Sequence, residues 1–110
     1  MVNRPDLEIL KNLKRELVES FGEEIVNVIL FGSHAKNFAH ENSDVDIIVI
    51  IKNKDADWKF KDSIRNIFYD YSIDYGILFD ILIISEHELQ HTLRGSQPVF
   101  KKALNQGIYL

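Results

Sequence analysis

Three aspartates occur where the sequence is otherwise typical of buried strands, and their oxygen atoms could bind a cation or accept a proton. Asp44 and Asp46 open the apolar run DVDIIVII at 44–51, and Asp80 interrupts the run GILFDILII at 76–84. Because side chains alternate between the two faces of a strand, Asp44 and Asp46 share a face, about 7 Å apart. Two carboxylates at this spacing repel each other unless a positive group lies between them.

Asp80 is flanked by apolar residues on both sides, which predicts a buried carboxylate. An ionised carboxylate buried without a partner is costly, so we expect it to be protonated, paired or metal-bound. If its strand lies beside that of Asp46, all three carboxylates converge on one cation, and such oxygen ligands suit Mg²⁺. The alternative is structural: Asp44 caps a turn, Asp46 pairs with a lysine or arginine, and Asp80 marks a strand bend.

A small-residue loop precedes the first two aspartates. Gly32 allows close approach of a ligand or a positive φ, and Ser33 offers a hydroxyl and an N–H group. A strand followed by a loop and a helix start presents free N–H groups, which suit a phosphate. Lys36 could reach the same phosphate, and Ser43 is expected to cap the turn before Asp44.

A second motif, HELQH at 87–91, matches the H-E-x-x-H pattern of zinc hydrolases. Two histidines at i and i+4 on a helix can bind Zn²⁺, but a third protein ligand is needed. Residues 92–110 contain no His, Asp or Glu that could supply it. Ser85 and Glu88 also have the spacing of a helix capping box, so we interpret Glu88 as a structural residue.

The sequence predicts elements in the order helix, strand, strand, helix, strand and helix, and these must position the candidate site residues. Apolar residues recur at helical spacing from Leu7 to Val18, and Gly22 is a plausible end of that helix. β-Branched runs predict strands at 24–31, 44–52 and 76–85. Helices are expected within 54–74, after Ser85 and over 98–104. The fold class is therefore α/β or α+β, a small mixed sheet flanked by helices, with the strand order left open.

Length and composition limit the class of protein. A chain of 110 residues suits a single domain over 1–110, and its ordinary apolar fraction of 45% favours a folded core over disorder. The net charge of −4 disfavours nucleic acid as a major partner. There is no cysteine, no apolar stretch of membrane-spanning length and no signal-peptide pattern at the start, so we expect a cytoplasmic protein without a membrane partner.

The residues Gly32-Ser33-x-Ala35-Lys36, Ala39 and Ser43-Asp44-x-Asp46 resemble the signature of the DNA polymerase β-like nucleotidyltransferase superfamily. Within it, the chain is similar to the minimal nucleotidyltransferase proteins. The resemblance is specific over 31–49 and extends more loosely to Asp80 and to NQGIYL at 105–110. Asn37 stands where the family usually has glycine, and Lys36 where it often has arginine.

The resemblance implies transfer of a nucleoside monophosphate, AMP from ATP, to a hydroxyl acceptor. Asp44, Asp46 and Asp80 would be the catalytic and metal-binding residues for two Mg²⁺ ions, with Asp80 also helping to deprotonate the acceptor. The nucleotide would be held by Gly32, Ser33, Lys36 and Ser43. In this family the acceptor can be a tyrosine of a separate helical HEPN toxin, which implies an antitoxin role.

Two other functions remain open from the sequence. One is a non-catalytic module that neutralises a helical partner by contact alone. The other is transfer to a small molecule such as an aminoglycoside, for which a homo-oligomer would have to complete the acceptor pocket.

Overall fold

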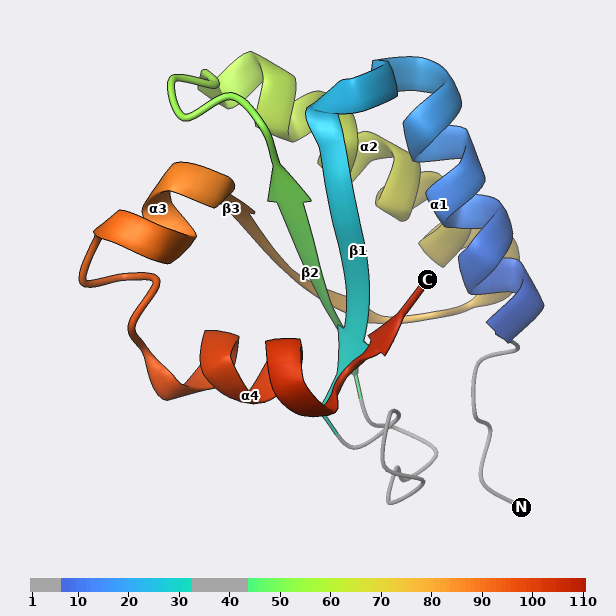
Figure 1. Cartoon of the computed structure of the whole chain (residues 1–110). Helices are drawn as coiled ribbons and strands as arrows, with labels where there is room; N and C mark the ends of the chain where they lie inside the picture. Colours follow the sequence, from blue (N-terminus) through green and yellow to red (C-terminus); the bar gives the residue numbers. More distant parts are fainter. Residues whose placement is uncertain (1–6, 33–43) are drawn as a thin grey trace.

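The computed structural model describes residues 7–32 and 44–110, and these form a four-stranded mixed sheet with helices on both faces (Figure 1). The strands are β1 (Ile25–Phe31), β2 (Val45–Ile51), β3 (Phe79–Ser85) and β4 (Ile108–Tyr109), in the order β3-β2-β1-β4. β1 pairs antiparallel with β2 and β4, whereas β2 and β3 are parallel. The predicted fold class is confirmed, and the strand order that the sequence left open is now defined.

One face of the sheet is covered by two long helices, α1 (Leu7–Phe21) and α2 (Trp58–Tyr75). Their buried residues Leu10, Leu13, Leu17, Ile64 and Phe68 pack against alternate residues of β1, β2 and β3. The ends of both helices follow local rules. Gly22 and Gly76 take positive φ after α1 and α2, and the Asp57 carboxylate accepts a hydrogen bond of 2.9 Å from the Phe60 N–H at the start of α2.

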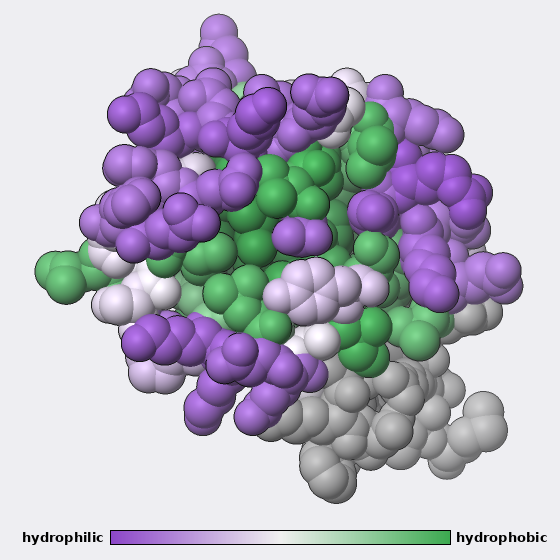
Figure 2. All heavy atoms as spheres, in the orientation of Figure 1, coloured by the Kyte–Doolittle hydropathy of each residue, from purple (hydrophilic) through white to green (hydrophobic). Residues whose placement is uncertain are grey.

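The opposite face is covered by two shorter helices, α3 (Glu86–His91) and α4 (Pro98–Gln106). Phe100 and Ala103 of α4 pack on Ile29, Ile48 and Ile84 of the sheet. Figure 2 shows apolar side chains still visible on this face, inside a rim of hydrophilic side chains. The two shorter helices therefore leave part of this face open.

Two expectations from the sequence need correction. β3 begins at Phe79 and not at Gly76, so Asp80 is its second residue, and the Asp80 side chain is exposed. β3 is also an edge strand, and its residues become buried only from Ile83 onward. The predicted burial of Asp80 is wrong, because apolar neighbours in the sequence do not bury the open end of an edge strand. The short strand β4 was not predicted.

No helix within the two described ranges is long and apolar enough to cross a membrane.

Candidate active site

The sheet register brings two of the predicted carboxylates together. Asp46 of β2 and Asp80 of β3 are register partners in the parallel pair, so the two residues are neighbours across the strands. Asp44 immediately precedes β2, and the Val45 N–H donates a hydrogen bond of 2.7 Å to the Leu78 carbonyl just before β3. This bond ties the beginnings of the two strands together. The three aspartates thus lie at one end of the sheet.

The carboxylates lie on the α3/α4 face of the sheet. Asp46 alternates with Ile48 and Ile50, which belong to the core under α4, and Asp80 alternates with Leu82 and Ile84 of the same core. Asp44 and Asp80 are exposed and Asp46 is half-buried, so all three remain accessible to a solvent-borne ligand. The exposure relieves the burial cost that the sequence predicted for Asp80, but it leaves like charges close together.

Gly32 lies beside the carboxylates, at the end of β1. It follows Phe31, the register partner of Asp46, and takes a φ of +75°. A Cβ atom built on Gly32 would overlap the Asp46 carboxylate and lie 3.2 Å from its carboxyl carbon. Glycine is therefore required here for two reasons, the left-handed backbone and the contact with a predicted catalytic side chain. Ser33, Lys36, Asn37 and Ser43 lie outside the described residues.

The three aspartates are ligands of the type that binds divalent cations. Aspartate oxygens are hard ligands, and the three aspartates share one end and the neighbouring strands of one sheet face. As the side chains stand, no group of three His, Asp or Glu residues within 7–32 and 44–110 is close enough together to hold a metal ion. Metal binding at Asp44, Asp46 and Asp80 therefore stays a prediction.

The H-E-x-x-H motif has a structural explanation. Ser85 and Glu88 form the predicted capping box at the start of α3: the Ser85 hydroxyl accepts a 3.1 Å hydrogen bond from the Glu88 N–H, and a Glu88 oxygen accepts one of 3.3 Å from the Ser85 N–H. The other Glu88 oxygen is paired with Arg94 Nη1 at 3.0 Å. Burial tends to raise the pKa of Glu88, but the Ser85 and Arg94 hydrogen bonds outweigh it, and this pKa is lowered from 4.5.

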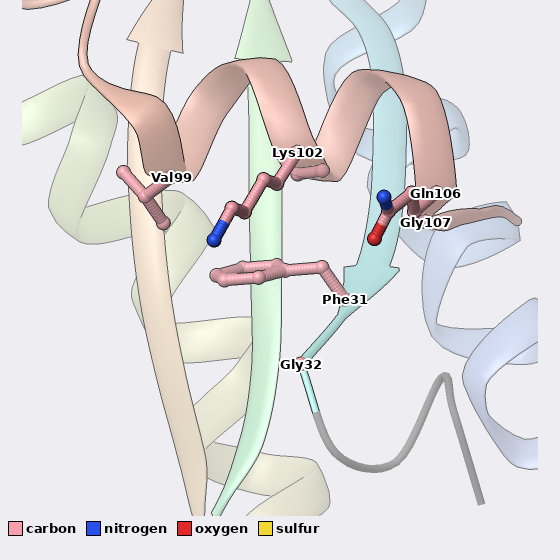
Figure 3. Close-up of a pocket in the computed structure, with 7 residues that line it drawn as sticks. Phe31, Gly32, Val99, Lys102, Gln106 and Gly107 are labelled. Atoms are coloured by element: carbon pink, nitrogen blue, oxygen red, sulfur yellow. The ribbon is translucent and has the colours of Figure 1, made fainter.

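A hollow of about 120 Å³ adjoins the carboxylate end of the sheet, and sequence reasoning missed it. It lies between the end of β1 and α4, and Gly32 forms part of its wall (Figure 3). Val99, Lys102 and Gln106 line it from one stripe of α4, at i, i+3 and i+7. This helical spacing was the sequence signal that could have identified the three residues as a group.

Comparison with known proteins identifies the class. The model of the nucleotidyltransferase domain family matches residues 10–89. The chain is also 35% identical over 77 residues to "Putative protein adenylyltransferase MJ0141" of Methanocaldococcus jannaschii, an alignment that covers 70% of this chain and 77% of the relative. The chain therefore belongs to the nucleotidyltransferase domain family, and the predicted enzyme class is confirmed at the level of that family.

A second relative and two solved structures extend the comparison. "Putative protein adenylyltransferase MJ1305" of the same organism is 32% identical over 99 residues, with 86% of this chain and 66% of the relative covered. A crystal structure of "a putative nucleotidyltransferase from Sulfolobus solfataricus" superposes with a TM-score of 0.55 at 20% identity, covering 94% of this chain and 77% of the other. The structure described as "the toxin-antitoxin with AMP-PNP" gives 0.58 at 20% identity, covering 90% and 70%. The structural likenesses support the fold.

Proposed function

We propose that this chain is a Mg²⁺-dependent protein adenylyltransferase that moves AMP from ATP onto a tyrosine of a helical HEPN partner toxin, and so acts as an antitoxin. The observation that carries the proposal is the register of Asp46 with Asp80 on an accessible sheet face, closed by Gly32. Two relatives named as protein adenylyltransferases, and solved toxin–antitoxin complexes of the same fold, support this choice of acceptor and partner.

In the proposed reaction, the acceptor hydroxyl oxygen forms a bond to the α-phosphorus of ATP. The bond between that phosphorus and the bridging oxygen to the β-phosphate breaks, and pyrophosphate leaves with the electron pair. Asp80 accepts the hydroxyl proton, a role that suits an exposed carboxylate at the open end of an edge strand. Gly32 and the residues that follow it hold the phosphates against the sheet end.

Asp44, Asp46 and Asp80 would hold the Mg²⁺ ions. When bound, these ions neutralise phosphate charge and orient the attacking and leaving oxygens for in-line displacement. In their absence, the three carboxylates would repel a triphosphate, so the site as built requires cations before a nucleotide can bind. The carboxylates would orient the ions and so set where the α-phosphate lies relative to Asp80.

The test uses the purified chain together with the proposed helical HEPN partner. With Mg²⁺ present, ATP labelled at the α-phosphate should label the partner, whereas ATP labelled at the γ-phosphate should not. Replacing the acceptor tyrosine of the partner with phenylalanine should remove the label. Label from the γ-phosphate would show phosphoryl transfer instead, and neutralisation of the toxin without any label would favour a module that acts by contact alone.

A further inference from the structure

The hollow beside β1 combines an apolar floor with two polar side chains. Phe31, Val99 and Ala103 form the apolar part, and Lys102 and Gln106 supply a cation and an amide. In Figure 3, Lys102 extends from α4 toward Phe31, and Gln106 lies above the end of β1 beside Gly107. Both polar side chains are exposed. A mostly apolar concavity with a few polar groups is typical of a small-molecule subsite.

The hollow is continuous with the candidate active site. Phe31 is the register partner of Asp46, which in turn is the partner of Asp80, so the floor of the hollow and the two carboxylates form one row across three strands. Gly32 belongs to both, because it lines the hollow and contacts the Asp46 carboxylate. A nucleotide whose phosphates lie at Gly32 and the carboxylates therefore has this hollow directly beside it.

Size and charge indicate which part of a nucleotide occupies the hollow. The hollow has a volume of about 120 Å³, which is below the roughly 150 Å³ of an enclosed cavity that binds benzene. A whole nucleotide therefore does not fit, and a flat base occupies the hollow only with part of its ring system outside, because the hollow is open to solvent. Lys102 makes no ion pair with a carboxylate among the described residues. Its charge is available for a phosphate, in a site where three aspartates and a triphosphate accumulate negative charge.

We propose that this hollow is the nucleobase subsite of the nucleotide site, with the base on Phe31 and Val99, Gln106 at the base edge, and Lys102 on the phosphates. This inference rests on the proposed function, and it assigns the base preference of the proposed nucleotidyltransferase. A glutamine amide both donates and accepts hydrogen bonds, which matches the donor and acceptor edge of adenine, whereas the corresponding edge of guanine presents two acceptors. The subsite therefore favours ATP over GTP.

The test is calorimetric titration of the full chain in Mg²⁺ with ATP, GTP and inorganic tripolyphosphate. ATP should bind at least about tenfold more tightly than tripolyphosphate, because only ATP carries a base to stack. Gln106→Ala should weaken ATP binding about three- to tenfold and leave tripolyphosphate unchanged. Val99→Phe, which fills the hollow, should have the same selective effect. Lys102→Ala should weaken both ligands.

Two exposed neighbours on α4 provide matched controls. Asn105→Ala and Lys101→Ala remove the same kinds of group one residue away, from positions that do not line the hollow. Both should leave all three titrations unchanged. Gln106→Arg adds donors at the base edge and should narrow the preference for ATP over GTP.

Four results would overturn the inference. Equal affinity for ATP and tripolyphosphate, or ATP binding that is indifferent to Gln106→Ala and Val99→Phe, would place the base elsewhere and leave the proposed function standing. Variants that keep ATP affinity but raise the KM for the protein acceptor would show that the hollow takes an acceptor side chain. Absence of binding by both ATP and tripolyphosphate would remove the proposed function as well.

Discussion

The two ends of β3 carry polar residues of opposite character. At the Ser85 end, a hydroxyl, a carboxylate and a guanidinium satisfy one another: Glu88 receives hydrogen bonds from Ser85 and Arg94, and Arg94 also donates to the Ile83 carbonyl at 3.1 Å. At the Asp80 end, the register places a second aspartate beside the first. Polar groups that complement each other stabilise the fold, whereas two aspartates side by side at an accessible end of the sheet are the donors expected for a bound cation.

The largest effect is expected at the Asp80 end. The double substitution Asp44→Asn and Asp46→Asn should abolish AMP transfer, because the site loses two of the three carboxylates proposed to hold the cations. The variant should still fold, because Asp44 is exposed and Asp46 is only half-buried. Transfer assays and thermal unfolding of the same preparations measure both. Loss of the fold together with activity would show that the aspartates are structural.

A smaller effect is expected at Gly32. Gly32→Ala places a methyl group against the Asp46 carboxylate and strains a backbone at φ +75°. Displacing a catalytic group by about an ångström can cost about a hundredfold in rate, and the strain should cost about 1–3 kcal/mol in the free energy of unfolding. Steady-state kinetics and denaturant unfolding report these two quantities separately.

Gly76→Ala is the matched control for that substitution. Gly76 has a similar φ of +66°, but a Cβ there would meet no atom within 4 Å. The Gly76→Ala variant should lose stability as Gly32→Ala does, but it should keep full activity. Equal losses of activity in the two variants would mean that Gly32 acts only through the backbone.

At the Ser85 end the effect should fall on stability alone. Glu88→Ala removes the capping-box acceptor and the partner of Arg94, and should lower the free energy of unfolding by about 1–2 kcal/mol. The rate of AMP transfer by the folded protein should not change. Denaturant unfolding measures the stability, and an assay of AMP transfer without denaturant measures the rate. A large loss of rate would make Glu88 part of the active site.

The pH dependence of the unfolding free energy tests the structural role of Glu88 further. Its pKa is lowered in the folded protein, so its ionised form contributes stability that is fully present above the ordinary value of 4.5 and is lost as the pH falls through the folded-state pKa. The difference in unfolding free energy between the wild type and Glu88→Gln should therefore shrink as the pH is lowered below 4.5. A constant difference down to acidic pH would contradict the ionised pairing.

The smallest effect is expected for the two histidines of α3. Their rings lie 4.9 Å apart and both side chains are exposed. His87→Ala combined with His91→Ala should change the free energy of unfolding by less than about 0.5 kcal/mol and leave transfer intact. If the wild type had a Zn²⁺-dependent hydrolase activity that this double variant lost, the H-E-x-x-H motif would be a zinc site and not only part of a capping box.

Local signals in the sequence predicted much of this fold. The β-branched runs indicated β1 and β2, and the Ser85 and Glu88 spacing predicted the capping box, because these features depend on neighbours a few residues away. The strand order and β4 could not be predicted in this way. β4 has two residues and forms by pairing with β1, so its existence depends on a contact between distant parts of the chain.

The structure brings together two of the residues predicted for the site, but the environment of one of them differs from the prediction. Aspartates within apolar runs singled out Asp44, Asp46 and Asp80 in the sequence, and the structure makes Asp46 and Asp80 register partners. Asp80 was expected to be buried, yet it is exposed because it lies near the open end of an edge strand. The hollow under α4 was missed, since its residues come from 31–32 and 99–107 and meet only when the sheet has formed.

The most direct test compares Asp80→Asn with Glu88→Gln, two substitutions that each neutralise one carboxylate at opposite ends of β3. Intact-mass measurement of the helical partner, after incubation with each variant, ATP and Mg²⁺, reports addition of AMP. Asp80→Asn should slow this addition by about a hundred- to ten-thousandfold, the contribution typical of a positioned general base, and Glu88→Gln should match the wild type. Equal rates for the two variants would contradict the assignment of this end of the sheet as the active site.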